Sequence, residues 1–169
     1  MVQKAFVASA CIIIAIGTLA ATGVVIPGLA FAHSGHGNYA AKPFAAGERG
    51  DPRKPFRTIE VVMTDDGGKM AYMLDRVDVK NGEQIKFVLR NAGLVDHEFL
   101  IDTVANNTRH KAEMQKNPEM AHEEPNGARL KPGTTKEILW RFTKPGSFEF
   151  ACLLPGHYES GMKGVVAIK

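Results

Sequence analysis

Three side chains that bind soft metals lie within eleven residues near the carboxyl end of the chain. The stretch reads Cys-Leu-Leu-Pro-Gly-His-Tyr-Glu-Ser-Gly-Met and carries Cys152, His157 and Met162. Its Pro-Gly pair and its later glycine are turn-forming residues, which lets the imidazole and the thioether return toward the sulfur. A second imidazole must come from elsewhere, and His97, at the head of an expected strand, is well placed. A thiolate, two imidazoles and a weak axial thioether are the ligand set of a type 1 copper centre.

Other uses of these residues fit the pattern less well. Zinc prefers a second thiolate or a third hard ligand, and Met is a poor zinc ligand. A cysteine nucleophile needs His and Asn or Asp partners and a substrate cleft, and a methionine at this spacing has no role in that chemistry. Each residue alone is more often a core or surface group. Together, and in this order, they favour copper, and no pattern for an enzyme accompanies them.

The elements that must position these ligands are short strands. Apolar residues alternate with polar ones, and Gly, Pro and Asn turns separate the segments. The expected strands are 59–63, 72–79, 84–90, 97–101, 138–142, 148–152 and 165–168. A polar insertion covers about 103–130, with a short helix expected over 106–116 that stops before Pro118. The pattern predicts an all-β domain, an antiparallel sandwich or barrel.

The amino-terminal part differs in composition. Residues 1–32 have a basic start, a long apolar run, helix breakers and a terminal Ala-Phe-Ala, which predicts a secretory signal peptide. An uncleaved membrane anchor is the alternative, because the run is long enough to span a bilayer. Residues 33–55 are rich in Gly, Ala and Pro, and we expect a flexible arm there. Cleavage removes Cys11, so the exported protein keeps Cys152 as a single thiol in an oxidising compartment, where we expect it to be occupied or buried.

Charge and length exclude other classes of protein. The 169 residues suit one domain, and we expect a monomer. The net charge of +3 is scattered along the chain, so nothing indicates nucleic-acid binding. After signal cleavage no apolar segment remains that would insert stably into a membrane.

Further motifs resemble a known family. Asn91-Ala-Gly before His97, Pro132-Gly133 before Trp140-Arg-Phe, and Phe148-Glu-Phe-Ala-Cys are similar to the cupredoxins over 56–169. The resemblance implies a Greek-key β-sandwich with one copper near an end of the domain, beneath three loops. Its four ligands fall on the same His, Cys, His and Met. The loop from the cysteine to the methionine resembles that of rusticyanin more than the shorter plastocyanin loop. With the insertion, it most resembles small periplasmic cupredoxins linked to copper tolerance.

One position departs from the family. Plastocyanin-like and azurin-like members usually have Asn after the first histidine, where it ties the copper loops together; this chain has Glu98. A charged, unpaired carboxylate there would favour Cu(II) over Cu(I). Alternatively, Glu98 points away from the metal and pairs with a surface Lys or Arg.

Two functions remain open at this stage. One is electron transfer with a cytochrome or copper oxidase, and the other is periplasmic copper tolerance together with copper-export machinery. For the second function, an additional copper site is a hypothesis at the mature amino terminus. The histidines and methionines that could take part in such sites are His33, His36, His110, Met114, Met120 and His122. Alternatively, the insertion binds no copper and is a capping loop whose polar residues face solvent.

Overall fold

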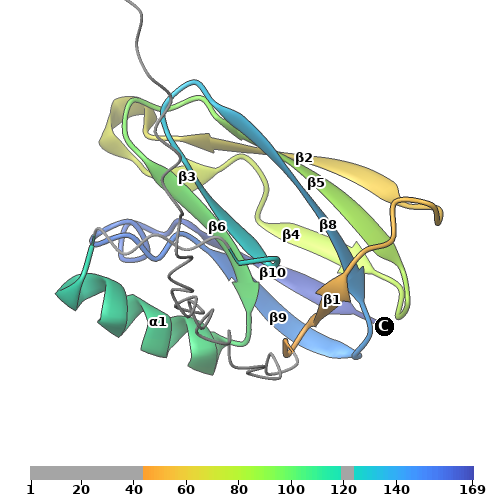
Figure 1. Ribbon diagram of the computed structural model, residues 1–169. Coiled ribbons are helices and arrows are strands. Elements are labelled where there is room, and N and C mark those ends of the chain that lie inside the picture. The colour runs from red at the N-terminus through yellow and green to blue at the C-terminus, as the bar shows by residue number, and fades with distance from the viewer. Residues whose placement is uncertain (1–43, 119–123) are drawn as a thin grey trace, which may run out of the picture. The chain divides into compact units, whose positions relative to one another are not determined.

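The structure is a computed structural model, and it describes residues 44–118 and 124–169. The expected signal peptide, the His33 and His36 pair, and two insertion residues (Met120 and His122) lie outside the described residues. Within the described ranges the chain folds into two five-stranded sheets packed as a sandwich (Figure 1). No helix in these ranges is both long enough and apolar enough to cross a membrane.

Each sheet mixes strands from distant parts of the chain. The first has the order β1 (Gly47–Arg49), β8 (Thr135–Phe142), β5 (Gln84–Asn91), β2 (Arg57–Thr64) and β3 (Ala71–Tyr72). The second has the order β4 (Arg76–Val79), β10 (Lys163–Ile168), β9 (Gly146–Ala151), β6 (His97–Asp102) and β7 (Gly127–Leu130). A short 3-10 turn, η1 (Asp66–Gly68), follows β2.

The pairing confirms the predicted sandwich and corrects the expectation that it is antiparallel throughout. β2 pairs with β5 in parallel, and β4 pairs with β10 in parallel, whereas the other pairs are antiparallel. Parallel neighbours need a crossover rather than a hairpin. The chain provides one because it passes from β2 to β5 by way of β3 and β4, which belong to different sheets.

Alternation along the strands builds the core between the sheets. In β5 the side chains of Ile85, Phe87 and Leu89 are fully buried, while Lys86 between them reaches the outer face and pairs with Glu137. Opposite faces of a strand alternate with a period of two, so one sequence pattern supplies both surfaces. Large aromatic side chains from both sheets fill the space between them: Phe87, Trp140 and Phe142 from the first, Phe99, Phe148 and Phe150 from the second.

The predicted arm over 33–55 differs from the structure where its residues are described. β1 pairs with β8 at the edge of the first sheet, with Gly47 opposite Phe142. Ala46 is buried, and the Phe44 ring meets the Trp140 ring edge-on at 5.3 Å. The strand is only three residues long, which is too short for an alternation pattern to reveal.

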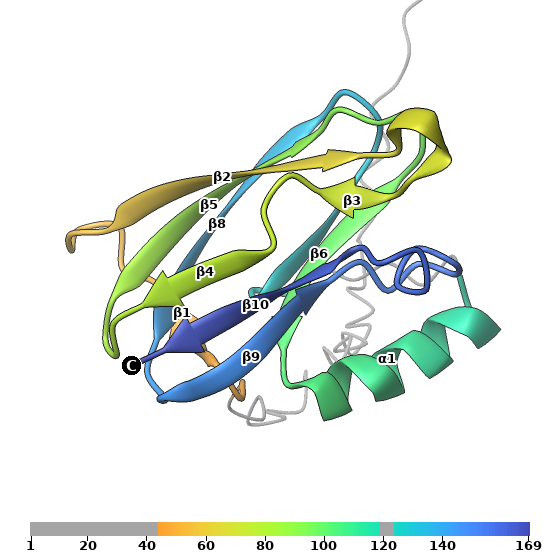
Figure 2. The same cartoon turned by 180° about the vertical axis from the view of Figure 1, so that it is seen from behind.

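The insertion contains the expected helix, α1 (Val104–Lys116), which begins two residues earlier than predicted. Thr103 caps it, because its side chain accepts a hydrogen bond from the backbone N–H of Asn106 (3.1 Å). α1 packs against β6 and β9 on the outside of the second sheet (Figure 2). The last residues of the predicted insertion form β7, which extends that sheet beside β6.

Candidate metal centre

The predicted ligands lie at the ends of two neighbouring strands. β6 begins with His97, and Cys152 follows the last residue of β9. β6 and β9 are antiparallel with Leu100 opposite Ala151, so the start of β6 lies beside the segment that leaves β9. The backbone N–H of Glu98 accordingly donates to the Cys152 sulfur (3.2 Å).

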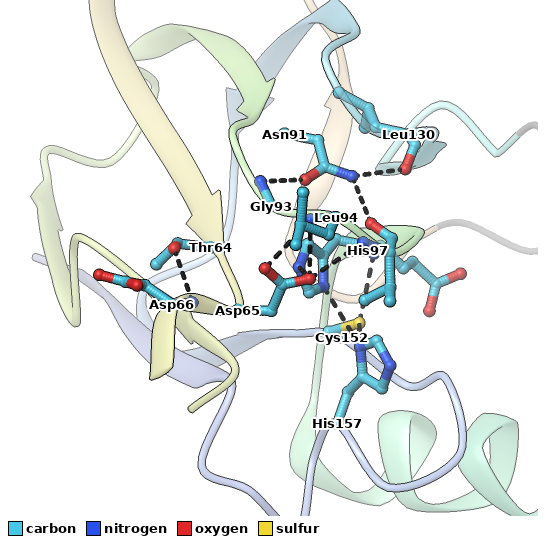
Figure 3. A network of polar contacts seen from close by, with 12 residues as sticks. Thr64, Asp65, Asp66, Asn91, Gly93, Leu94, His97, Leu130, Cys152 and His157 are labelled. Carbon is cyan, nitrogen blue, oxygen red and sulfur yellow. Dashed lines mark hydrogen bonds and ion pairs between the residues drawn. The ribbon is translucent and has the colours of Figure 1, made fainter. Parts of the chain in front are cut away.

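Three donor atoms converge in this corner of the sandwich (Figure 3). Nδ1 of His97 lies 3.2 Å from Nδ1 of His157, and the latter lies 3.3 Å from Sγ of Cys152. All three donor atoms lie within 4.8 Å of one another. His97 and Cys152 are fully buried and His157 is 8% exposed. Within the described residues this is the one cluster of His, Cys, Asp and Glu that could hold a metal ion.

The spacing and the protonation states fit a bound metal. Metal–nitrogen bonds of about 2.0 Å at tetrahedral angles place two nitrogens about 3.3 Å apart, close to the 3.2 Å seen here. Burial lowers the pKa of both histidines, so both rings are neutral at neutral pH and offer lone pairs. Burial also raises the pKa of the Cys152 thiol to about 12. A thiolate in this place therefore requires a cation beside it, which a metal supplies.

The loop between β9 and β10 bends as its glycines predict. Gly156 and Gly161 have φ of 86° and 97°, a left-handed conformation that side chains with a Cβ disfavour. Met162 is fully buried, its backbone N–H donates to the His157 carbonyl (3.2 Å), and its carbonyl accepts from the Cys152 N–H (3.0 Å). These bonds keep the methionine at the site, and its thioether as the axial ligand stays a prediction.

Glu98 does not reach the surface, contrary to one of the two alternatives for this residue. Its side chain is 2% exposed, and its carboxylate accepts a hydrogen bond from the Leu153 N–H (3.1 Å). That bond joins the start of β6 to the loop that carries Cys152, so the carboxylate ties the two loops together where other members of the family have asparagine. Burial raises the pKa of Glu98 to about 7, against the hydrogen bond from Leu153, which lowers it.

Hydrogen bonds with two side chains, Asn91 and Asp65, hold the loop between β5 and β6 in place. The Asn91 side chain donates to the carbonyls of Val95 (2.8 Å) and Leu130 (3.0 Å) and accepts from Gly93. Asp65, at the end of β2, accepts from the N–H groups of Leu94 and Val95 in the same loop. Sequence reasoning missed Asp65, because nothing in its Asp-Asp-Gly-Gly turn relates it to the ligands.

Helix α1 contacts the loop between β9 and β10, here called the ligand loop, from the outside of the sandwich. Lys111 pairs with Glu159 at 2.8 Å, and its ammonium lies 4.4 Å from the centre of the Tyr158 ring. The Tyr158 hydroxyl donates to the buried carboxylate of Glu149 (3.0 Å), which also accepts from Asn107 of the helix (3.0 Å). The polar residues of the insertion therefore do more than face solvent. Met114, considered above as a copper ligand, is instead fully buried in the hydrophobic core.

The described residues form a β-sandwich with a buried cluster of two imidazoles and a thiol that could hold a metal ion. Comparison with known families assigns the chain to a family of metal-binding proteins. A profile of the copper-binding proteins of the plastocyanin/azurin family matches residues 59–169, and the chain belongs to this family.

Relatives of known name are similar over most of the chain. A copper-resistant cuproprotein CopI of Rubrivivax gelatinosus is 43% identical over 139 residues, which cover 82% of this chain and 81% of the relative. A protein of the same name from Pseudomonas aeruginosa is 30% identical, covering 90% of this chain and 94% of its own. Auracyanin B is similar in fold, with a TM-score of 0.59 and 20% identity over 73% of this chain and 96% of auracyanin B.

Proposed function

We propose that this protein binds one copper ion in a type 1 site through His97, Cys152, His157 and Met162. The observation that carries the proposal is the convergence of two neutral imidazole nitrogens and one buried sulfur within bonding range of a single point. Soft thiolate and thioether donors combined with imidazole suit copper better than harder metals. Burial of His97, Cys152 and Met162 and the backbone bonds of the loop between β9 and β10 support a site that is largely formed before copper binds.

The role we propose is copper tolerance. Two relatives that align over four fifths or more of this chain are named copper-resistant cuproproteins. An exported protein with a buried copper site would bind copper in the periplasm before it reaches other thiols, and copper-export machinery would be its partner. No catalytic step is part of this proposal.

Electron transfer is the second candidate, and one observation favours it. His157 is 8% exposed and lies on a loop anchored at both ends, so this ligand residue reaches the surface while the site stays rigid. A rigid site changes little between Cu(II) and Cu(I), which suits electron exchange with a cytochrome or copper oxidase.

Copper titration of the purified protein, with growth of a deletion strain in excess copper, tests both parts. We expect one equivalent of Cu(II) to develop thiolate-to-copper absorption, and wild-type protein but not Cys152→Ser to restore growth. Ser160→Ala is a matched control, since this hydroxyl lies on the same loop and, among the described residues, bonds only to the Gly156 carbonyl. Absence of the absorption rejects the type 1 site. Restored growth with Cys152→Ser rejects its role in tolerance.

A further inference from the structure

The outer nitrogen of His97 lies in an unusual place for a ligand histidine. Nδ1 of the ring points toward His157 and the sulfur, so Nε2 is the atom that points away. Nε2 is fully buried and makes no hydrogen bond within the described residues. A ligand histidine ordinarily donates its second ring N–H to a carboxylate, a carbonyl or water, which fixes the ring and its tautomer.

The group that faces Nε2 is the carboxylate of Asp65. Its Oδ2 lies 4.0 Å from Nε2, and its side chain is 12% exposed. Figure 3 shows the Asp65 carboxylate beside Leu94 and His97. The same oxygen accepts N–H bonds from Leu94 (2.8 Å) and Val95 (2.9 Å). These partners are neutral, so they orient the carboxylate and leave its negative charge in place. Asp96, the other acid near His97, is instead paired with Arg129 at 3.0 Å.

A glycine keeps the space between these two groups open. A Cβ built on Gly93 would lie 2.9 Å from Nε2 of His97 and 2.9 Å from both Cγ and Oδ1 of Asp65. Any other residue would therefore push the carboxylate and the ring apart. The Gly93 N–H is held by the Asn91 side chain (2.9 Å), so the backbone cannot easily move aside.

We propose that Asp65 is a positioning residue for His97: its carboxylate holds the ring with the proton on Nε2 and Nδ1 free for the metal. It also keeps a negative charge beside the ligand, which favours Cu(II) over Cu(I). The second effect rests on the proposed copper site, whereas the first is a property of the metal-free protein. Gly93 is required because it lets the two groups approach.

Nitrogen NMR of the metal-free protein, at a pH where His97 is neutral, tests the first effect. We expect wild-type His97 to carry its proton on Nε2, and Asp65→Asn to lose this preference while its amide oxygen still accepts from the loop. Gly93→Ala should also lose the preference for a proton on Nε2, although the charge of Asp65 is retained. Asp66→Asn is the control, because it removes the same charge one residue away and should leave the tautomer unchanged. A wild-type His97 with its proton on Nδ1 overturns the proposal even if a variant fails to fold.

The copper-loaded proteins test the second effect. Loss of a partner to a ligand histidine typically costs about 10–100-fold in metal affinity, and we expect a loss of this size in Cu(II) affinity for Asp65→Asn. Its reduction potential should shift upward, and the Asp66→Asn protein should stay near wild type in both. Equal shifts in the two variants would show only a general effect of charge and would overturn the assignment. If wild-type protein binds no copper, the proposed function fails, and the tautomer result still decides the role of Asp65.

Discussion

The buried carboxylate of Glu98 gives a prediction about stability that needs no metal. In the folded protein the pKa of Glu98 is raised from its ordinary value of 4.5 to about 7, first because burial removes it from water. Between these two pH values the unfolded chain releases the proton and the folded chain keeps it. Stability therefore falls as the pH rises through this window. Below pH 4.5 both states are neutral at this residue, and above pH 7 both are charged.

The size of this loss follows from the two pKa values. Each tenfold change in proton affinity corresponds to about 1.4 kcal/mol, so a pKa of about 7 instead of 4.5 lowers the free energy of unfolding by about 3 kcal/mol above pH 7. The residue is 2% exposed, so water screens little of this cost. Glu98→Gln removes the dependence, because an amide stays neutral and its oxygen still accepts from the Leu153 N–H.

The assay is urea unfolding of the metal-free, reduced protein, followed by the fluorescence of the single tryptophan, Trp140, which is fully buried. We expect the stability of Glu98→Gln, relative to wild type, to increase by about 3 kcal/mol between pH 4.5 and pH 8. The lowered pKa values of His97 and His157 make stability rise with pH, opposite to the effect of Glu98. Both proteins contain these histidines, so their contribution cancels when the two free energies of unfolding are subtracted. Glu137→Gln, at an exposed pair with Lys86, is the control. A relative stability that does not change with pH would refute the argument.

Four further predictions concern the site and its support. Cys152→Ser should abolish the absorption of the Cu(II) protein, and a variant that keeps it would contradict the assignment of the sulfur. Met162→Leu should keep copper and raise the reduction potential, because a weak axial ligand tunes the metal more than it retains it; voltammetry measures this, and loss of all copper would count against an axial role. Asn91→Ala should destabilise the protein by about 3 kcal/mol in urea unfolding, since three hydrogen bonds of a buried side chain are lost. Mass spectrometry of the exported protein should show a chain that begins at His33, and a mass that includes residues 1–32 would indicate an anchor instead.

The strands and the ligand loop could be predicted because their signals are local. The alternation in β5 is unbroken from Ile85 to Asn91, and it fixes which side chains are buried. The two glycines of the ligand loop adopt the turns that their conformational freedom permits. Both kinds of signal depend on neighbours in sequence. β1 could not be found in this way, because it is short and depends on a partner, β8, almost a hundred residues away.

The support of the site could not be predicted for a related reason. Asp65 acts on a loop 29 and 30 residues further along the chain, and Glu98 acts on Leu153, 55 residues away. A carboxylate is usually exposed, so the sequence alone favours a surface position for both. Backbone N–H groups at this end of the sandwich hold both carboxylates in place. The β5–β6 loop and the ligand loop leave β-pairing here, so their N–H groups need other acceptors. The buried carboxylate of Glu98 and the partly buried one of Asp65 meet that need, next to Cys152 and His97. The bonds from Leu94 and Val95 that satisfy the backbone also bring the Asp65 carboxylate to within 4.0 Å of His97, and in the proposed copper site this charge would favour Cu(II).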